Sequence, residues 1–231
     1  MKKFYFITPL IFQTIVWPIR PFLILFGLLE VRGIENIKNL PNGIIFASNH
    51  SSELDPILLP ASFPLLSRFL PIFYVSREKK FYDADGIKKR IYGGMFFKLW
   101  GAHPAYFGLH DYEKSLVNHI ELLKHKKNIM IFPEGKIPAD GKIGEARGGV
   151  AYLAYRTNAP IVPVAISGSR NFTFKDFFTG KGHIILSIGK PITTQELLNN
   201  INLDNPEAYK IAAQKLMNII EKMLPNNISN N

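Results

Sequence analysis

The 231-residue chain contains no cysteine, and its 18 aspartates and glutamates are outnumbered by 28 lysines and arginines. Because cysteine is absent, a thiolate metal site and a covalent intermediate on a thiol are excluded. The shortage of acidic residues leaves a formal net charge of +10 at pH 7. Such a charge is typical of proteins that bind nucleic acid or an anionic membrane leaflet, and charge alone does not separate the two.

Also missing is a serine in an obvious nucleophile elbow. What is present is His50, which leaves the apolar run 43–48 and is followed five residues later by Asp55. Neutral imidazole takes a proton from a hydroxyl, and an aspartate on its other ring nitrogen fixes the tautomer. We therefore expect a substrate hydroxyl to attack an activated acyl group directly, with His50 as the general base.

The spacing of His50 and Asp55 makes a demand on the backbone between them. In a continuous helix, side chains five residues apart point about 140° away from each other. The two therefore meet only if residues 51–54 form a turn, which Asp55-Pro56 supports as a favoured N-cap and first helical residue. The alternative is that Asp55 only caps a helix and His50 only ends a strand.

Two further blocks extend this pattern. Residues 128–135 form a short apolar run ending in a Pro-Glu-Gly turn, so Glu134 lies at a strand end and the backbone at Gly135 can approach a ligand. Residues 159–168 predict another core strand. In this order and spacing, NHSSELD, FPEG and APIVPVAISG resemble the lysophospholipid acyltransferase family, which includes 1-acylglycerol-3-phosphate acyltransferases, over roughly residues 33–191.

The resemblance implies a role for each matching residue. His50 would deprotonate the acceptor hydroxyl, Asp55 would orient it, and Glu134 and Gly135 would belong to the acceptor-binding turn. The implied donor is an acyl thioester of coenzyme A or acyl carrier protein. The implied acceptor is a lysolipid such as 1-acylglycerol-3-phosphate or a related lysophospholipid. No metal or organic cofactor is expected.

Two departures from the family pattern concern the acceptor. The family usually follows FPEG with a small hydroxyl residue and an arginine, where this chain has Lys136-Ile137, and Phe107 stands where a second arginine is usual. Lys136, Arg147 and Arg170 are substitute phosphate ligands, Lys136 being nearest the turn, although Arg147 and Arg170 also fit as solvated surface charges. A phosphate-free acceptor stays open, as does a non-catalytic lipid-binding or membrane-tethering protein on the same scaffold.

The N-terminal segment favours a membrane over nucleic acid as the partner of this basic chain. Basic clusters at 77–80 and 88–90 lie among aromatic residues and suit either partner, but residues 4–29 are almost entirely apolar and follow Lys2-Lys3. Pro18-Ile19-Arg20-Pro21 interrupts this segment, which predicts two short helices lying in one leaflet. A cleaved signal peptide is disfavoured, because no cleavage site follows the apolar segment. A pair of core helices is the remaining alternative. We expect membrane lipids as partners, no nucleic acid, and a location on the cytoplasmic face of the inner or plasma membrane.

Strands and helices alternate along the remainder of the chain. Strands are predicted at 43–48, 72–76, 128–132, 161–166 and 183–188, and helices at 56–61, 87–100, 111–125, 145–157, 193–199 and 206–224. This alternation predicts an α/β fold with a mixed, largely parallel sheet flanked by helices. The predicted organisation is an N-terminal two-helix membrane motif at 1–32, an acyltransferase domain at 33–224 and a disordered tail at 225–231.

Overall fold

The computed structural model describes residues 4–15, 19–26, 28–76, 97–106, 111–199, 201, 205 and 207–225. Lys2-Lys3, the two basic clusters, Phe107 and residues 226–231 lie outside these ranges, so the predictions made for them stay predictions.

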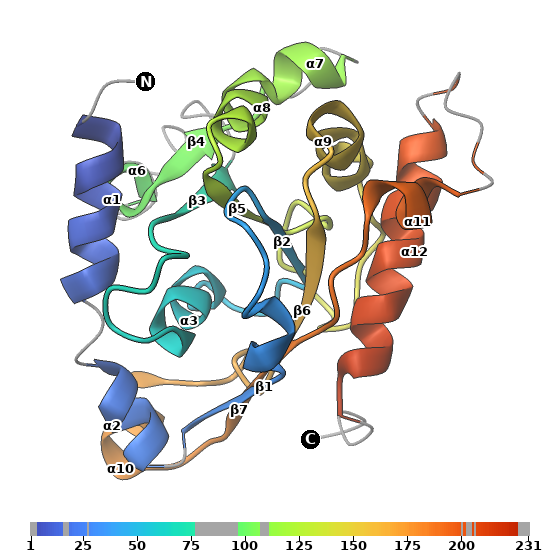
Figure 1. Ribbon diagram of the computed structural model, residues 1–231. Helices are drawn as coiled ribbons and strands as arrows, with labels where there is room; N and C mark the ends of the chain where they lie inside the picture. Colours follow the sequence, from blue (N-terminus) through green and yellow to red (C-terminus); the bar gives the residue numbers. More distant parts are fainter. Residues whose placement is uncertain are drawn as a thin grey trace, which may run out of the picture.

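In the described residues, one seven-stranded sheet forms the centre of the molecule (Figure 1). Its strands are β1 (Leu29–Arg32), β2 (Ile45–Ser48), β3 (Ile72–Ser76), β4 (Ala102–Pro104), β5 (Asn128–Ile131), β6 (Ile161–Ser167) and β7 (Ile184–Ile188). Their order is β1-β7-β6-β2-β5-β3-β4, and every neighbouring pair is parallel except β6 and β7. The predicted mixed, largely parallel sheet is confirmed.

Helices cover both faces of this sheet, and for that reason its central strands are apolar throughout. On one face lie α8 (Val117–Lys124), α9 (Gly149–Thr157), α11 (Thr194–Leu198) and α12 (Glu207–Met223); on the other lie α1 (Phe4–Ile15), α2 (Ile19–Leu25) and α3 (Asp55–Ser62). Ile45 and Ala47 enter the first core, whereas Ile44 and Phe46 enter the second. The shorter helices are η1 (Ile34–Ile37), α6 (Phe97–Trp100), α7 (Tyr112–Ser115) and α10 (Phe174–Thr179).

The elements differ from the sequence-based expectations mainly at the edges of the fold. The predictions missed β1 and β4, the two short outer strands, because neither forms a continuous buried apolar run. Strand β1 already lies in the sheet, although it falls in the segment 1–32 assigned to the N-terminal motif. The helix predicted at 111–125 is two helices, because Leu116 between α7 and α8 leaves helical dihedrals. Helix α9 begins at Gly149 rather than at residue 145.

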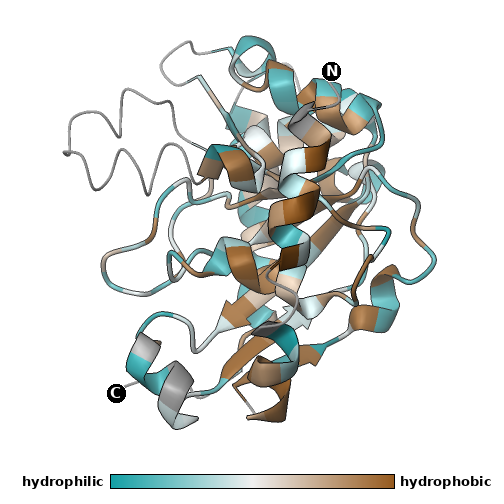
Figure 2. Ribbon diagram, turned by 90° about the vertical axis from the view of Figure 1, so that its left-hand side faces the viewer, coloured by the Kyte–Doolittle hydropathy of each residue, from teal (hydrophilic) through white to brown (hydrophobic). Residues whose placement is uncertain are grey.

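The N-terminal segment forms the two helices α1 and α2, as predicted (Figure 1). One side of α1 is held by Gln13, whose amide donates to Ile72 O (2.7 Å) and Trp100 O (2.8 Å) and accepts from Ile72 N (2.8 Å). Figure 2, which views the molecule from this side, shows apolar residues along both helices. By length and composition alone, the 20-residue span Phe6–Leu25 is sufficient to cross a membrane, and only 21% of it is buried. So little burial argues against a pair of core helices.

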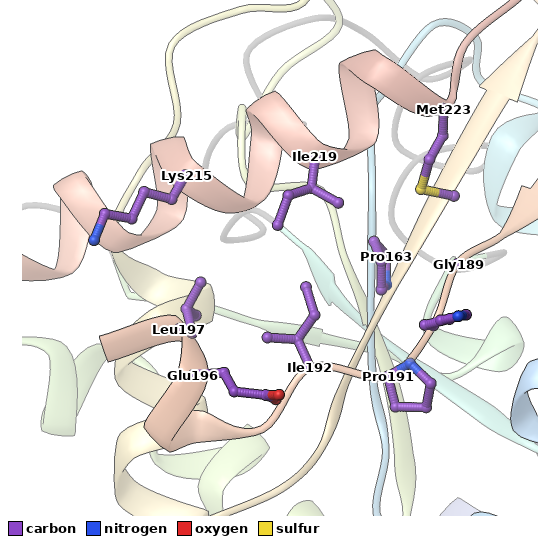
Figure 3. A pocket seen from close by; sticks show the side chains of 10 residues that line it. Pro163, Gly189, Pro191, Ile192, Glu196, Leu197, Lys215, Ile219 and Met223 are labelled. Carbon is purple, nitrogen blue, oxygen red and sulfur yellow. The ribbon is translucent and has the colours of Figure 1, made fainter. Parts of the chain in front are cut away.

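A cavity of about 480 Å³ lies between α12 and the segment that follows β7 (Figure 3). Its apolar wall includes Pro163, Ile192, Leu197 and Ile219. Ile192 bridges to Ile161 at the beginning of β6, and Ile161 pairs with Ile45 at the beginning of β2. The cavity is therefore near the amino-terminal ends of these strands, whereas His50 follows the carboxyl end of β2.

Candidate active site

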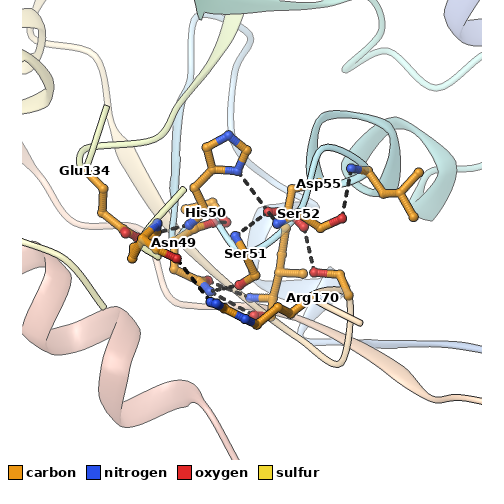
Figure 4. A network of polar contacts seen from close by, with 12 residues as sticks. Asn49, His50, Ser51, Ser52, Asp55, Glu134 and Arg170 are labelled. Atoms are coloured by element: carbon orange, nitrogen blue, oxygen red, sulfur yellow. Dashed lines mark hydrogen bonds and ion pairs between the residues drawn. The ribbon is translucent and has the colours of Figure 1, made fainter. Parts of the chain in front are cut away.

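The candidate site lies where three neighbouring parallel strands end, and it contains both predicted residues and one that was not predicted, Ser169. In the order β6-β2-β5, Ser169 follows β6, His50 follows β2 and Glu134 follows β5. The carboxyl ends of parallel strands share one edge of a sheet, so residues far apart in sequence meet there. Figure 4 shows these residues joined in one polar network.

Asp55 is the centre of this network. Its side chain is fully buried, and Oδ2 lies 3.0 Å from Nδ1 of His50. The same oxygen accepts the backbone N–H groups of Ser51 (2.6 Å) and Ser52 (2.8 Å), while Oδ1 accepts the hydroxyl of Ser169 (2.7 Å). The buried carboxylate is thus surrounded by hydrogen-bond donors, which is the condition for burying such a group.

The backbone between the two residues forms the turn that their spacing requires. The N–H of Asp55 donates to Ser52 O (3.1 Å), and the hydroxyl of Ser52 accepts from the N–H of Leu54 (3.2 Å). Asp55 is the first residue of α3, and Leu54, at the N-cap, makes no side-chain cap bond. Because the Asp55 carboxylate faces residues 50–52 instead of the helix N–H groups, the alternative role of Asp55 as a helix cap is wrong.

The imidazole of His50 is held in a single orientation. Its ring stacks on Phe132 with 4.0 Å between centroids and 16° between planes. An ionised carboxylate only accepts hydrogen bonds, so the bond to Asp55 places the proton on Nδ1 and leaves the lone pair on Nε2. Figure 4 shows that this second nitrogen points away from Asp55, and the side chain is 18% exposed. The arrangement is that of a general base open to a substrate on one side.

Glu134 lies beside this pair but is occupied by the backbone. Its side chain is buried, Oε1 accepts the N–H of His50 (3.0 Å) and Oε2 accepts the N–H of Gly144 (3.2 Å). Burial raises the pKa of Glu134, and the two N–H groups oppose this rise because they stabilise the carboxylate. The structure therefore shows Glu134 linking the base to the loop after FPEG.

Of the cations predicted as phosphate ligands, Arg147 and Lys136 lie at the FPEG turn. Gly135 has φ +68°, and a Cβ added there would lie 2.9 Å from Nε of Arg147, so glycine allows the guanidinium to lie against the turn. The N–H of Arg147 donates to Pro133 O (2.8 Å), and Lys136 is exposed directly after the turn. The sequence left two roles open for Arg147, a phosphate ligand or a solvated surface charge. The structure places its side chain against the turn at Gly135.

Arg170 is placed differently from the other two cations. Its guanidinium donates to Pro138 O (3.1 Å) and Ala139 O (2.5 Å), the carbonyls of the loop that follows FPEG. Gly141 has φ +76°, and a Cβ there would lie 2.4 Å from Nη1 of Arg170. The side chain thus lies flat on this loop and holds its backbone.

Sequence reasoning missed two residues of the network. Asn49 is buried and pairs with Ile166 like a further rung of the sheet, donating to its O and accepting its N–H (both 2.8 Å). Ser169 is also fully buried and lies just beyond the third block, which we ended at Gly168. Asn49 directly follows the buried strand β2, and Ser169 follows the buried strand β6 after a single glycine; that position was the signal that could have found them.

No group of three or more histidines, aspartates or glutamates that could hold a metal ion occurs within the described part of the chain. In the network itself, the oxygens of Asp55 and Glu134 already accept hydrogen bonds from the protein.

The matches among known proteins are acyltransferases. A family model described as Acyltransferase matches residues 28–167. The 1-acyl-sn-glycerol-3-phosphate acyltransferase beta of Homo sapiens is 31% identical over 184 residues, covering 78% of this chain and 62% of that protein. The chloroplastic 1-acyl-sn-glycerol-3-phosphate acyltransferase BAT2 of Brassica napus is 26% identical over 166 residues, covering 71% of this chain and 44% of that protein. This chain thus spans about half the length of the curated relatives that it matches.

A solved structure has the same fold. The crystal structure of the 1-acyl-sn-glycerophosphate acyltransferase PlsC from Thermotoga maritima aligns with a TM-score of 0.61 and 18% sequence identity. The alignment covers 96% of this chain and 81% of that chain, so the sheet and its flanking helices are shared.

Proposed function

We propose that this chain, which belongs to the Acyltransferase family, moves an acyl group from a thioester of coenzyme A or acyl carrier protein to the hydroxyl of a lysolipid. The acceptor is 1-acylglycerol-3-phosphate or a related lysophospholipid. One observation carries the proposal: the 3.0 Å contact between His50 Nδ1 and the buried carboxylate of Asp55, with Nε2 turned outward.

The reaction follows from this geometry. Nε2 of His50 removes the proton of the acceptor hydroxyl while the hydroxyl oxygen attacks the thioester carbonyl. The tetrahedral intermediate collapses, the C–S bond breaks, and the leaving thiolate takes the proton from the imidazolium. Asp55 holds the ring and stabilises its positive charge during the transfer. The products are the acylated lipid and a free thiol, and the step requires no metal or organic cofactor.

The proposed phosphate ligands of the acceptor are Lys136 and Arg147. Both lie at the Gly135 turn, and that turn is tied to His50 through Glu134. A guanidinium binds a phosphate with two parallel hydrogen bonds, and an ammonium adds a point charge. Together they would supply the function of the arginines that this chain lacks.

Membrane association is part of the proposal, because a lysolipid resides in a bilayer. On α1 the exposed apolar residues Ile7, Ile11 and Ile15 recur every four positions, which places them on one face. On and just after α2, Phe22 and Phe26 are exposed and stack on each other, with ring centroids 5.1 Å apart. An apolar surface of this kind favours burial in the headgroup and acyl boundary of one leaflet.

Acyl transfer from labelled acyl-coenzyme A and acyl carrier protein tests the proposal. The acceptor panel contains 1-acylglycerol-3-phosphate, a lysophospholipid with a head group, and a phosphate-free monoacylglycerol. We expect transfer by the wild type and none above background by His50→Ala. Lys136→Ala should raise KM about tenfold for the phosphate-bearing acceptors, the value of one lost charged hydrogen bond, and leave KM unchanged for monoacylglycerol.

The matched control is Lys222→Ala, which removes an exposed lysine near the end of α12. It lowers the net charge equally, so an unchanged KM in this variant shows that the effect of Lys136 is local. If the wild type binds lipid but transfers nothing from either donor, the chain is instead a non-catalytic lipid-binding protein. Preference for monoacylglycerol would identify a phosphate-free acceptor.

A further inference from the structure

We propose that the turn Gly168–Arg170, which follows β6, positions both halves of the active site. Through Ser169 it fixes the carboxylate that orients the base, and through Arg170 it fixes the loop that follows FPEG. As a role in catalysis, this assignment rests on the proposed acyl transfer. The contacts themselves concern only residues of this chain.

The first contact of the turn is to Oδ1, the oxygen of Asp55 that does not face His50. Three donors meet Oδ2, namely the imidazole and two backbone N–H groups, whereas the one described partner of Oδ1 is the hydroxyl of Ser169. Both side chains are fully buried, so water does not replace the hydroxyl in this arrangement. Without Ser169, rotation of the carboxyl group would expose Oδ1 to other donors and draw Oδ2 away from the ring.

The backbone of the turn is built to make this contact. Gly168 has φ +80°, and a Cβ there would lie 2.0 Å from His183 O, so the chain passes directly against the segment before β7. The next residue, Ser169, lies against the first residue of α3, Asp55, which is 114 residues away in the sequence.

The second contact of the turn is made by Arg170, which binds the loop that follows FPEG. Arg170 donates to Pro138 O and Ala139 O and lies against Gly141, so it spans the loop between Lys136 and Gly144. The far end of this loop is held by Glu134 through the N–H of Gly144. Arg170 therefore sets the loop that begins with the proposed phosphate ligand Lys136, without itself having to touch the phosphate.

The two contacts predict two different kinetic effects. Loss of the Ser169 hydroxyl misorients the base, so kcat falls and KM stays the same. Loss of the Arg170 guanidinium loosens the acceptor loop, so KM rises for the acceptor. Because Arg170 acts through Lys136 and not on the phosphate, this rise should be confined to phosphate-bearing acceptors and should disappear when Lys136 is already replaced by alanine.

Ser169→Ala, Ser169→Thr and the control Ser62→Ala test the first half in the full-length protein. Ser62 is also buried, and its hydroxyl serves only its own helix by donating to Leu59 O. We expect kcat of Ser169→Ala to fall at least tenfold with KM within twofold, Ser169→Thr to recover part of the loss, and Ser62→Ala to keep wild-type kcat. In an Asp55→Ala background, Ser169→Ala should cause no further loss, because the hydroxyl acts only through that side chain.

A kcat of Ser169→Ala within twofold of the wild type would overturn the role of Ser169, as would an equal loss in the Asp55→Ala background. A readout without substrate separates this role from the proposed function. The proton on Nδ1 of His50 should give a downfield NMR resonance in the wild type, absent in Asp55→Ala and displaced in Ser169→Ala. The positioning role fails if that resonance is the same in Ser169→Ala as in the wild type, whether or not the protein transfers acyl groups.

Arg170→Lys and Arg170→Ala test the second half. We expect Arg170→Ala to raise KM about fivefold or more for 1-acylglycerol-3-phosphate, with kcat within threefold and with KM for monoacylglycerol unchanged. Added to Lys136→Ala, it should raise KM no further. Arg170→Lys should recover little, because an ammonium does not span two carbonyls as a guanidinium does. A further rise of KM when Arg170→Ala is added to Lys136→Ala would make Arg170 a phosphate ligand and overturn its role as a positioning residue.

Discussion

Replacement of Asp55 by asparagine separates the charge of this residue from its geometry. The amide oxygen can take the place of Oδ2 and still accept from His50, Ser51 and Ser52. The amide nitrogen then takes the place of Oδ1 and donates to the oxygen of Ser169, whose hydroxyl can rotate to accept. The imidazole keeps its orientation and its tautomer, so the variant loses chiefly the negative charge.

The cost of that loss can be worked from the distance between the two groups. The imidazolium formed during proton transfer lies next to the carboxylate, with 3.0 Å between Nδ1 and Oδ2. Two unit charges about 4 Å apart attract by about 4 kcal/mol at an effective dielectric constant of 20. The attraction exists in the transition state and not with neutral imidazole, so kcat should fall by about 10³-fold.

The assay is steady-state transfer to the best acceptor, with circular dichroism and thermal unfolding as checks of the fold. We expect a lower kcat, an unchanged KM and a melting temperature close to that of the wild type. His50→Ala/Asp55→Asn should be no slower than His50→Ala, because the carboxylate acts through the ring. Retention of more than a tenth of wild-type kcat in Asp55→Asn would refute the role of the charge. A loss of activity that parallels unfolding would refute catalysis by Asp55 altogether.

Two further predictions concern stability. Gln13→Leu removes three buried hydrogen bonds to backbone groups of Ile72 and Trp100 and should lower the free energy of unfolding by about 2–4 kcal/mol in urea titrations. Thr14→Ala, which removes a bond only within α1, should cost less than half as much. Burial lowers the pKa of His119 to about 4 from 6.5, so the folded state binds its proton more weakly than the unfolded chain. Stability should therefore decline as pH falls from 6.5 towards 4, by about 2 kcal/mol between pH 7 and pH 5, and His119→Gln should lose that much less over this range.

Much of the fold was predictable because the central strands are buried on both faces. An apolar run such as 128–132 or 161–166 is a strong signal, and the family resemblance drawn from three such runs and their flanking residues is confirmed by the match over residues 28–167. The outer strands β1 and β4 gave no such signal, because solvent reaches one side of them.

Contacts within the site were predictable only between residues that are close in sequence, whereas Glu134 was assigned to the site by its motif and not by a predicted contact. His50 and Asp55 could be paired by local geometry, and the required turn is present. Ser169 could not be assigned to Asp55, since that contact depends on β6 lying beside β2 in the sheet. The same holds for Arg147, whose approach to Gly135 depends on how the chain returns after FPEG.

The amide of Gln13 has a consequence for how the protein would sit on a bilayer. A membrane anchor joined by a flexible linker lets an enzyme change its orientation above the bilayer, so its active site faces the lipid only part of the time. Here the three bonds of Gln13 to Ile72 and Trp100 attach α1 directly to β3 and to the end of α6. Insertion of α1 into a leaflet would then fix the tilt of the whole molecule, and each lipid arriving by lateral diffusion would meet the site in the same pose.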